Sequence, residues 1–345
     1  MAVDPRQVLA GFLTLSMFVM LGNMIKHDHF SGTEMGLEAT GVEFNSVKVV
    51  DNAEMTDADR VGVDHLMEAD EELKQCWANP RPKVQPSKGF VTFSLTIGPE
   101  YHISQITAAV VIARYLGAAL VLPEVRGLEL GNKRKFEEMY DVDKFMRSLD
   151  GVVKVIHELP DEVSSRKPAV IRVPDQVTED FVSETIQPIF QKNNYLRLAV
   201  VFSSVSFKPK ETNNKDLDST ACLAMFSSLQ LKPEYSEVSK QMLDRLKESS
   251  KESEGVDDIM PAENKGEFLK SSNADLARAL DLEICSQSDV FVPAIAGLFY
   301  GHVTGKRIPS GRTQILVPAP GSSASARDFI STYVSKKSHL AYKCY

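Results

Sequence analysis

Residues 90–123 read FVTFSLTIGPEYHISQITAAVVIARYLGAALVLP, and this stretch decides the fold class. Residues 90–95 form a short β-prone apolar run that leads to a turn at Gly98, and residues 100–117 carry apolar side chains at helical spacing. A second β-prone run follows at residues 119–122. The order strand, glycine turn, helix, strand predicts one right-handed βαβ unit, the building block of a parallel α/β sheet.

The chain beyond this unit continues the alternation of helices and strands. An amphipathic stretch at residues 134–149 predicts a helix, and β-prone runs at residues 152–156 and 195–202 predict two more strands. Alternating strands and helices are typical of a doubly wound sheet. Residues 87–209 are therefore predicted to form a first Rossmann-like α/β domain.

The second half of the chain carries fewer strands. Helical segments are expected near residues 219–228, 233–247 and 273–282, whereas only residues 290–293 and 314–317 read as strands. A parallel sheet that is buried on both faces needs more than two strands. Residues 210–345 are therefore predicted either to dock on the first domain or to form an incomplete second domain.

The N-terminal region differs in composition from the rest. Residues 8–25 carry no charge, and as a helix they reach about 27 Å, which is enough for a thin bilayer. We predict an uncleaved signal anchor within residues 1–26, with a short cytoplasmic tail and a lumenal body; a cleaved signal peptide is the alternative. Residues 28–72 carry thirteen acidic and two basic side chains, which predicts a solvated stem over residues 27–86.

Composition and charge bound the kind of protein. A chain of 345 residues, 43% hydrophobic and 25% charged, is long enough for about two packed domains. Its 39 basic and 47 acidic side chains give a net charge of -8, so it lacks the basic excess that a nucleic-acid partner would require. The four cysteines, Cys76, Cys222, Cys285 and Cys344, show no C-x-x-C spacing and predict neither a zinc module nor a thioredoxin-like site. In an oxidising compartment they have three possible disulfide connectivities.

The glycine turn of the first βαβ unit is the first candidate binding site. Gly98 lies in the predicted turn between a strand and the helix that follows it. Free N–H groups at the start of a helix favour the binding of a phosphate. The turn does not match G-x-G-x-x-G, so ordinary turn chemistry is the alternative. His102, one turn into the helix, is placed to act as a general base near such a ligand; the alternative is a helix-face histidine without a chemical role.

A second candidate site lies near the C-terminal end of the chain. A buried strand is followed by Gly297, which allows close approach of the backbone, and Lys306 and Arg307 come one or two helical turns later. These features suit a nucleotide diphosphate; the alternative is a core strand with an incidental basic pair. Ser288 and Asp289 belong to the same segment, where Asp289 either accepts hydrogen bonds from a ribose or base or caps local backbone groups.

A possible metal site is weaker. Asp141 and Asp143 form a D-x-D pair, with which many sugar-nucleotide enzymes hold a divalent cation, but the pair lies in a helical pattern where Asp141 is expected to cap a helix. The sequence holds no Ser-His-Asp set, H-E-x-x-H motif, Walker loop or cluster of metal ligands, so it assigns no catalytic residue, metal or cofactor. A Rossmann-type oxidoreductase or methyltransferase is the weakest interpretation, because no dinucleotide fingerprint follows the first turn.

Five segments carry a resemblance to a known family. They read FVTFSLTIGPEYHISQI (90–106), ARYLGAALVLPEVRG (113–127), FEEMYDVDKFMRSLDGVVKVIHELP (136–160), ACLAMFSSLQLKPE (221–234) and SDVFVPAIAGLFYGHVTGKRI (288–308). In these segments the chain resembles the plant GDP-fucose protein O-fucosyltransferase-like family and, within it, the mannan-synthesis-related subgroup. The resemblance extends from the N-terminal anchor to the C-terminal tail.

The resemblance implies a fold, a location and a reaction. It implies GT-B-like Rossmann-type domains, the second incomplete here, in a single-pass type II protein of the Golgi membrane. It implies inverting, metal-independent transfer from GDP-fucose to a hydroxyl of a glycan or protein acceptor, in the making of mannan-type cell-wall polysaccharide. By position, Gly98 falls in the family's first donor loop, and its C-terminal donor-side motif contains Ser288, Asp289, Gly297 and Arg307. His102 and Lys306, taken from the sequence pattern, complete the candidate donor-binding set.

Two departures from the family pattern bear on activity. The sequence from Gly98 to His102, GPEYH, replaces the Gly-Gly-Leu-Asn loop of the wider family, and no counterpart is present for the strand whose arginine stabilises the departing diphosphate. Lys306 and Arg307 would have to offset that charge, an effect on the order of a few kcal/mol. We therefore predict a glycosyltransferase and keep, as the alternative, a non-catalytic Golgi partner that scaffolds a polysaccharide synthase.

Overall fold

The computed structural model describes residues 86–126, 133–174, 177–200, 207–208, 214–248, 259–268, 274–294, 296–317 and 330–345. All of them belong to one compact unit, Asn52–Tyr345. The anchor predicted at residues 8–25 and the stem predicted before residue 86 lie outside the described residues. Within the described part, no helix combines the length and the apolar character that a membrane span needs.

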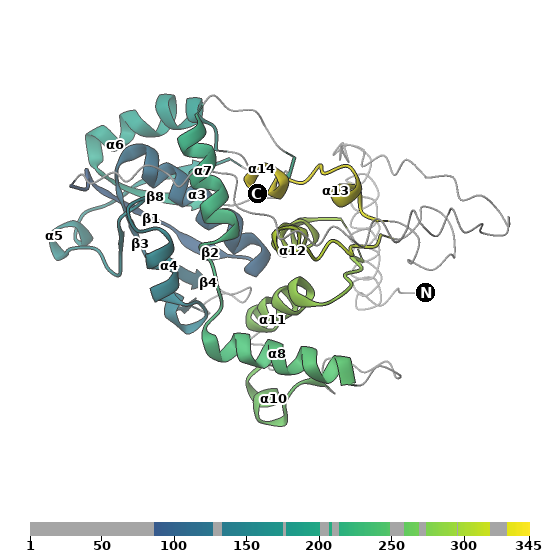
Figure 1. The fold of residues 1–345 in the computed structure, drawn as a ribbon. Helices are drawn as coiled ribbons and strands as arrows, with labels where there is room; N and C mark the ends of the chain where they lie inside the picture. The colour runs from purple at the N-terminus through teal and green to yellow at the C-terminus, as the bar shows by residue number, and fades with distance from the viewer. Residues whose placement is uncertain are drawn as a thin grey trace, which may run out of the picture. The chain divides into compact units, whose positions relative to one another are not determined.

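The first half of the folded region is an α/β layer built on a parallel sheet (Figure 1). Its strands are β1 (Phe90–Thr92), β3 (Ala119–Val121), β6 (Val155–Ile156), β7 (Ala169–Val173) and β8 (Tyr195–Val200), in the spatial order β6-β3-β1-β8-β7. Phe90 pairs with Ala119 on one side and with Tyr195 on the other, and all four pairings are parallel. The predicted α/β fold with a parallel sheet is confirmed.

Two strands of this sheet bend and continue into a second, smaller sheet. β2 (Ser94–Thr96) runs parallel to β4 (Glu124–Arg126), and β5 (Lys133–Arg134) pairs antiparallel with β4. The chain leaves the five-stranded sheet at Phe93 and again at Pro123, and proline lacks the N–H that a ladder requires. A further short strand therefore separates the carboxyl end of β1 from the helix that follows.

That helix, α3 (Pro99–Leu116), lies at the centre of the layer. It ends at Gly117, whose φ of 66° is a left-handed conformation that glycine adopts without strain. Most of its side chains are buried, because it contacts strands of both sheets and also packs against α7 (Lys215–Phe226). The guanidinium of buried Arg114 fixes the contact with α7, since its nitrogens lie 2.8 and 3.0 Å from the two carboxylate oxygens of Asp216.

The other helical segments of the first half are short. They are a 3₁₀ turn (Phe136–Glu138), α4 (Val142–Ser148), α5 (Asp161–Ser164), a π-helical turn (Phe181–Ile186) and α6 (Gln187–Asn193). The prediction of one helix over residues 134–149 is wrong, because the stretch breaks before α4. Asp141 accepts the N–H of Lys144 and caps α4, which confirms the capping interpretation of this aspartate.

Residues 214–345, where described, are mainly helical. Besides α7 they form α8 (Pro233–Glu248), α10 (Ala262–Phe268), α11 (Ala274–Gln287), α12 (Leu298–Arg307), a 3₁₀ turn (Ile308–Ser310), α13 (Thr332–Ser335) and α14 (Ala341–Cys344). α11 packs against α8, α12 and α3 (Figure 1). The strands predicted at residues 290–293 and 314–317 meet only in one parallel bridge, between Phe291 and Ile315. The described second half thus docks on the first through helices.

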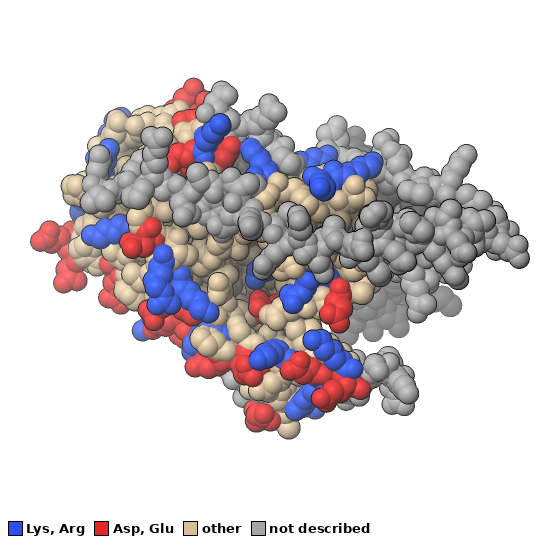
Figure 2. Space-filling model, viewed as in Figure 1, with Lys and Arg blue, Asp and Glu red and all other residues tan. Residues whose placement is uncertain are grey.

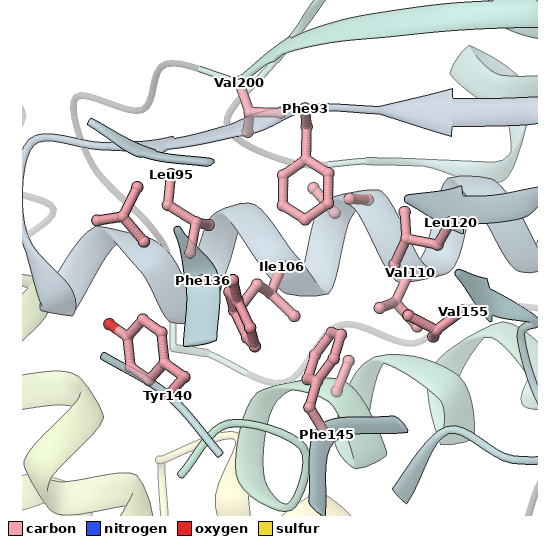
Figure 3. Packing of buried hydrophobic residues seen from close by; sticks show 14 of the residues in the cluster. Phe93, Leu95, Ile106, Val110, Leu120, Phe136, Tyr140, Phe145, Val155 and Val200 are labelled. Carbon is pink, nitrogen blue, oxygen red and sulfur yellow. The ribbon is translucent and has the colours of Figure 1, made fainter. Parts of the chain in front are cut away.

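One hydrophobic core runs through both halves. Figure 3 shows Ile106 and Val110 of α3 on the side of the helix that faces Phe136 and Phe145, whose ring centroids lie 5.0 Å apart. The same core includes buried side chains of α7, α8, α10 and α11. A smaller, separate core supports the C-terminal candidate site and contains Leu282, Phe291, Val303 and Ile315.

Charged side chains of both signs are interspersed over the face that Figure 2 shows. Elsewhere in the described residues, charged side chains form ion pairs near the surface, such as Lys232 with Glu234 at 3.0 Å. Pairs of this kind contribute little to stability. The described residues on this face do not gather into the basic stripe with which a protein follows a phosphate backbone.

The C-terminal segment is fastened to both α7 and α12. Cys344 forms a disulfide with Cys222 of α7, with the two Cα atoms 5.6 Å apart. The ring of His339 stacks on Phe207, and its Nε2 lies 2.9 Å from the carbonyl oxygen of Gly301 on α12. The disulfide thus joins the C-terminus to the helix packed on α3, while Cys285 is a free thiol, so the described residues hold one of the predicted pairs and not a pairing of all four cysteines.

We expect Cys344→Ser to lower the free energy of unfolding by about 3 kcal/mol, because the disulfide joins residues 122 positions apart and restricts the unfolded chain. Urea denaturation of the purified full-length protein, without reductant, measures the change. Cys285→Ser is the matched control: it removes a free thiol and should cost less than about 1 kcal/mol. A Cys344→Ser variant as stable as the parent protein would contradict the pairing.

Candidate functional site

The carboxyl ends of β1 and β8 mark the point where the strand order of the parallel sheet reverses. β3 and β6, which follow β1 in the sequence, lie on one side of β1. β7 and β8, which come later in the sequence, lie on its other side. Open α/β sheets bind ligands in the crevice at such a reversal. The side chain of Gln105 joins the end of β2, the strand that follows β1, to the end of β8, because its Nε2 donates to the carbonyl oxygens of Thr96 and Val200, each at 3.3 Å.

The turn between β2 and α3 is strained. The N–H of Gly98 donates to the carbonyl oxygen of Thr96 at 3.1 Å, and the residue between them, Ile97, has a φ of 78°. A three-residue turn with a positive φ at its centre is rare, and a β-branched residue is especially disfavoured there. Such strain persists only where the surroundings hold it, and it gathers at functional sites. Gln105 supplies that hold, since Oε1 accepts the N–H of Thr96 at 2.9 Å.

His102 is buried rather than exposed on the helix. Its Nδ1 lies 2.6 Å from the hydroxyl oxygen of Tyr140, and its Nε2 is buried without a hydrogen-bond partner among the described residues. Burial lowers the pKa of His102 to about 3, so the ring is neutral at physiological pH. The histidine is therefore placed to orient Tyr140, and its predicted contact with a donor remains a prediction.

A small pocket of about 20 Å³ opens beside this turn. It is lined from α3 by Pro99 and Ile103, from the loops by Tyr140, Leu229 and Leu231, and from α11 and α12 by Ala279, Leu282, Glu283 and Lys306. The wall is mostly apolar with a few polar groups, which is typical of small-molecule sites. The Nζ of Lys306 lies 3.4 Å from a carboxylate oxygen of Glu283, so the cation stands at the pocket within an ion pair.

Arg307 makes a different set of contacts from its neighbour Lys306. It is 0% exposed, and its guanidinium donates five hydrogen bonds. Their acceptors are the carbonyl oxygens of Cys285, Ser288, Asp289 and Gln314 and the hydroxyl of Ser288, at 2.6–3.2 Å. Burial lowers the pKa of Arg307 to about 10, which leaves it charged at neutral pH. We call this arrangement the Arg307 clamp; it joins the end of α11 to the segment that carries Gln314.

The structure thus divides the predicted site residues into two groups. The turn after Gly98, the His102–Tyr140 pair and Lys306 meet around the pocket. Ser288 and Asp289 belong to the Arg307 clamp. Gly297 stands apart from both as the residue before α12; its φ of 145° requires glycine, and a Cβ there would contact nothing. Donor contact by these residues remains a prediction.

Two charged residues that sequence reasoning did not select lie at the same turn. Glu100 is 4% exposed and forms an ion pair with Arg278 of α11. They are separated by 178 positions, so no local motif links them. The only sequence signal was Glu100 itself, an acidic residue in the first turn of a helix. Within the described part, no three side chains of His, Cys, Asp or Glu gather as a metal site.

Comparison with known proteins places the chain in a family. The profile described as GDP-fucose protein O-fucosyltransferase matches residues 103–270. The Arabidopsis thaliana protein named Protein MANNAN SYNTHESIS-RELATED 1 is 39% identical over 422 aligned positions that cover 100% of both chains. The Trigonella foenum-graecum protein named Protein MANNAN SYNTHESIS-RELATED is 35% identical, covering 100% of this chain and 99% of the relative. The chain belongs to the mannan-synthesis-related group of the O-fucosyltransferase family.

This membership confirms the family resemblance seen in the sequence. A likeness to solved structures is more remote: POFUT1 in complex with GDP-fucose is 12% identical, with a TM-score of 0.36 over 65% of this chain and 95% of that chain. The mannan-synthesis-related proteins are also longer than this one. The 422 aligned positions exceed the 345 residues of this chain by 77, so 77 positions of that alignment have no residue here.

Proposed function

We propose that this protein is a glycosyltransferase that uses GDP-fucose as donor and transfers fucose, with inversion and without a metal, to a hydroxyl of a glycan or protein acceptor. Membership of the O-fucosyltransferase family supports the reaction class. The names of the full-length relatives support a role in making mannan-type cell-wall polysaccharide. The observation that carries the proposal is the pocket beside the first turn of α3, lined by Pro99 of that helix and by Lys306 of α12.

Transfer of fucose from GDP-fucose requires positive charge near the leaving GDP. Breaking the fucosyl bond places growing negative charge on GDP, and preorganised cations or helix N-termini stabilise such charge. Lys306 and the start of α3 offer both at one pocket. Burial, and then the charges of Asp275 and Glu100, raise the pKa of Tyr140 well above the usual value, so the hydroxyl paired with His102 stays protonated at this pocket.

The proposal places the protein in the Golgi membrane as a single-pass type II protein. The uncharged stretch at residues 8–25 and the acidic segment after it support an anchor and a stem. The Cys222–Cys344 disulfide supports a lumenal position for the folded region, because disulfides persist in oxidising compartments.

Incubation of the purified full-length protein with GDP-fucose and either mannan oligosaccharides or peptide acceptors is expected to release GDP. Lys306→Gln should weaken GDP binding about tenfold, since one charge-assisted contact contributes about 1.5 kcal/mol. Lys240→Gln removes the same charge from an exposed site on α8 and should leave binding unchanged. No GDP release with any acceptor, from protein shown to be folded, would count against the enzyme.

Two observations favour a second function without catalysis. The Arg307 guanidinium donates its hydrogen bonds to the protein's own carbonyl oxygens, and 77 positions of the alignment with a full-length relative have no residue in this chain. The protein would then be a non-catalytic scaffold for a polysaccharide synthase. Co-purification with the synthase, and rescue of mannan synthesis by the Lys306→Gln variant at normal abundance, would support the scaffold. Failure of that variant to rescue would favour catalysis.

A further inference from the structure

The carboxylate of Glu100 lies at the place where the sequence predicts a phosphate. Glu100 is the second residue of α3, and its carboxylate folds back over Gly98: a Cβ built on Gly98 would lie 2.9 Å from Oε2. An anion beside the first turn of a helix is stabilised by the helix dipole. Here the dipole acts without free N–H donors at Gly98, Pro99 and Tyr101, because Pro99 has no N–H and the other two donate to the carbonyl oxygens of Thr96 and Gly98. The chain therefore supplies its own anion to the N-terminus of its central helix.

The two oxygens of this carboxylate differ in their contacts. Oε1 is paired with Nη2 of Arg278 on α11, whereas Oε2 is buried without a hydrogen-bond partner among the described residues. A buried carboxylate oxygen without a donor is unfavourable. Glu100 is thus held at the turn by one strong partner only, and that partner is accessible, since the Arg278 side chain is 42% exposed.

The ion pair does not line the pocket itself but lies one residue along each helix from side chains that do. Pro99 and Ala279, the chain neighbours of Glu100 and Arg278, both line it, and Lys306 lines the same wall. A phosphate at this wall meets the ammonium of Lys306 and the start of α3, beside which the partly exposed guanidinium of Arg278 is paired with Glu100. Guanidinium groups bind phosphate oxygens well because their N–H donors can form two parallel hydrogen bonds.

The charges at the turn nevertheless leave little attraction for an added anion. Glu100 and Asp275 both lie close enough to Tyr140 to raise its pKa. Asp281 is a further carboxylate close to Arg278: burial raises the pKa of Asp281, and the charge of Arg278 lowers it. Arg278 therefore already lies among carboxylates, and an added negative group is repelled unless one of them moves or is neutralised. Glu100 is the carboxylate that lies over Gly98, so its displacement frees the start of α3.

We propose that Glu100 is an internal competitor for the anionic part of the ligand, and that Arg278 is the ligand-binding cation that it occupies. The inference rests on the proposed function, in which that anionic part is the diphosphate of a nucleotide sugar. Binding exchanges one ion-pair partner of Arg278 for another. If Glu100 holds Arg278 nine-tenths of the time, the apparent Kd is about tenfold higher than that of the freed site.

Calorimetry of the purified full-length protein with inorganic pyrophosphate, and separately with GDP, tests the proposal. Glu100→Gln keeps the volume of the side chain and removes its charge, so it should bind pyrophosphate at least about tenfold more tightly than the parent protein. Adding Arg278→Gln should abolish this gain. Glu234→Gln, which removes a carboxylate from the exposed pair with Lys232, is the matched control and should change nothing.

Glu100→Gln protein that is folded by circular dichroism and binds pyrophosphate no more tightly than the parent would overturn the proposal, as would a double variant that keeps the gain. If Glu100→Gln does not fold, the proposal is tested by the pyrophosphate affinities of the single variants Arg278→Gln and Arg278→Lys, in which Glu100 is kept. The proposal requires that glutamine loses most of the pyrophosphate affinity and that lysine retains more of it. Equal affinities of these two variants would overturn the proposal.

The two ligands separate this inference from the proposed function. Tighter pyrophosphate binding by Glu100→Gln, with no GDP binding by any form, would sustain the internal competitor and remove GDP-fucose as donor. GDP binding with the same affinity in the parent protein and in Glu100→Gln would sustain the donor and remove the competitor.

Discussion

Lowering the pH from 7.5 to 5 is expected to reduce the free energy of unfolding by about 6 kcal/mol, about 2 kcal/mol for each of three buried histidines. These are His102, His302 and His339, none more than 2% exposed. Burial lowers the pKa of His102 and of His302 to about 3 and that of His339 to about 4. For His302, the nearby His339 and Lys306 lower the pKa further.

The sign follows from which state binds the protons. In the unfolded chain a histidine has a pKa of about 6.5, so it is protonated as the pH falls through that value, while the folded histidines stay neutral down to about pH 4. The unfolded state then binds more protons, and stability is lost on acidification. The contacts of His339 are those of a neutral ring. Its Nδ1 accepts the N–H of Ala341 at 3.0 Å, and a proton on Nδ1 would break that hydrogen bond.

Urea denaturation at pH 7.5, 6 and 5 measures this dependence, and it samples the histidines before most carboxylates are protonated. His102→Gln removes one of the three titrating groups, so the loss between pH 7.5 and 5 should shrink by about a third. A parent protein equally stable at pH 7.5 and pH 5 would contradict the prediction, because these histidines would then have similar pKa values in the folded and unfolded states.

The parts of the fold that the sequence predicts best are those with strong local patterns. The first βαβ unit is present, with its helix at residues 99–116, because its strands are β-prone and its helix carries apolar residues at helical spacing; the strand predicted at residues 90–95 is divided at Phe93 into β1 and β2. β7 was missed although its buried and exposed positions alternate, since two of its five residues, Val170 and Arg172, are exposed at the edge of the sheet. An edge strand has a weaker apolar signal than a central one.

The candidate site shows where sequence reasoning stops. It located the turn at Gly98 and the basic pair at residues 306–307 from local chemistry, but it could not tell which cation faces the pocket. That depends on the angle of about 100° between successive side chains of a helix. The Glu100–Arg278 ion pair could not be predicted from the sequence for another reason. It forms because α11 packs against α3, and no local sequence pattern encodes that packing.

Arg307→Met is expected to lower the free energy of unfolding by about 3–5 kcal/mol. The change leaves four carbonyl oxygens around the Arg307 clamp without the guanidinium that now donates to them, and removing one member of a buried charged network has a cost of this size. The free energy of unfolding of Arg307→Lys should lie between those of the parent protein and Arg307→Met, because an ammonium has three N–H donors and lacks the planar geometry of the guanidinium. Guanidinium chloride denaturation measures both variants.

The neighbouring residue supplies the control that separates support of the fold from binding. Lys306→Met removes a partly exposed cation, so it should change stability by less than about 1 kcal/mol while it weakens GDP binding at the pocket. Arg307→Met should show the opposite pattern in whatever fraction stays folded: large destabilisation with little direct effect on GDP affinity. An Arg307→Met protein that is as stable as its parent but no longer binds GDP would mean that the guanidinium leaves the clamp to meet the donor. The C-terminal donor-side motif would then act on the ligand directly, rather than by holding α11 and α12 in place.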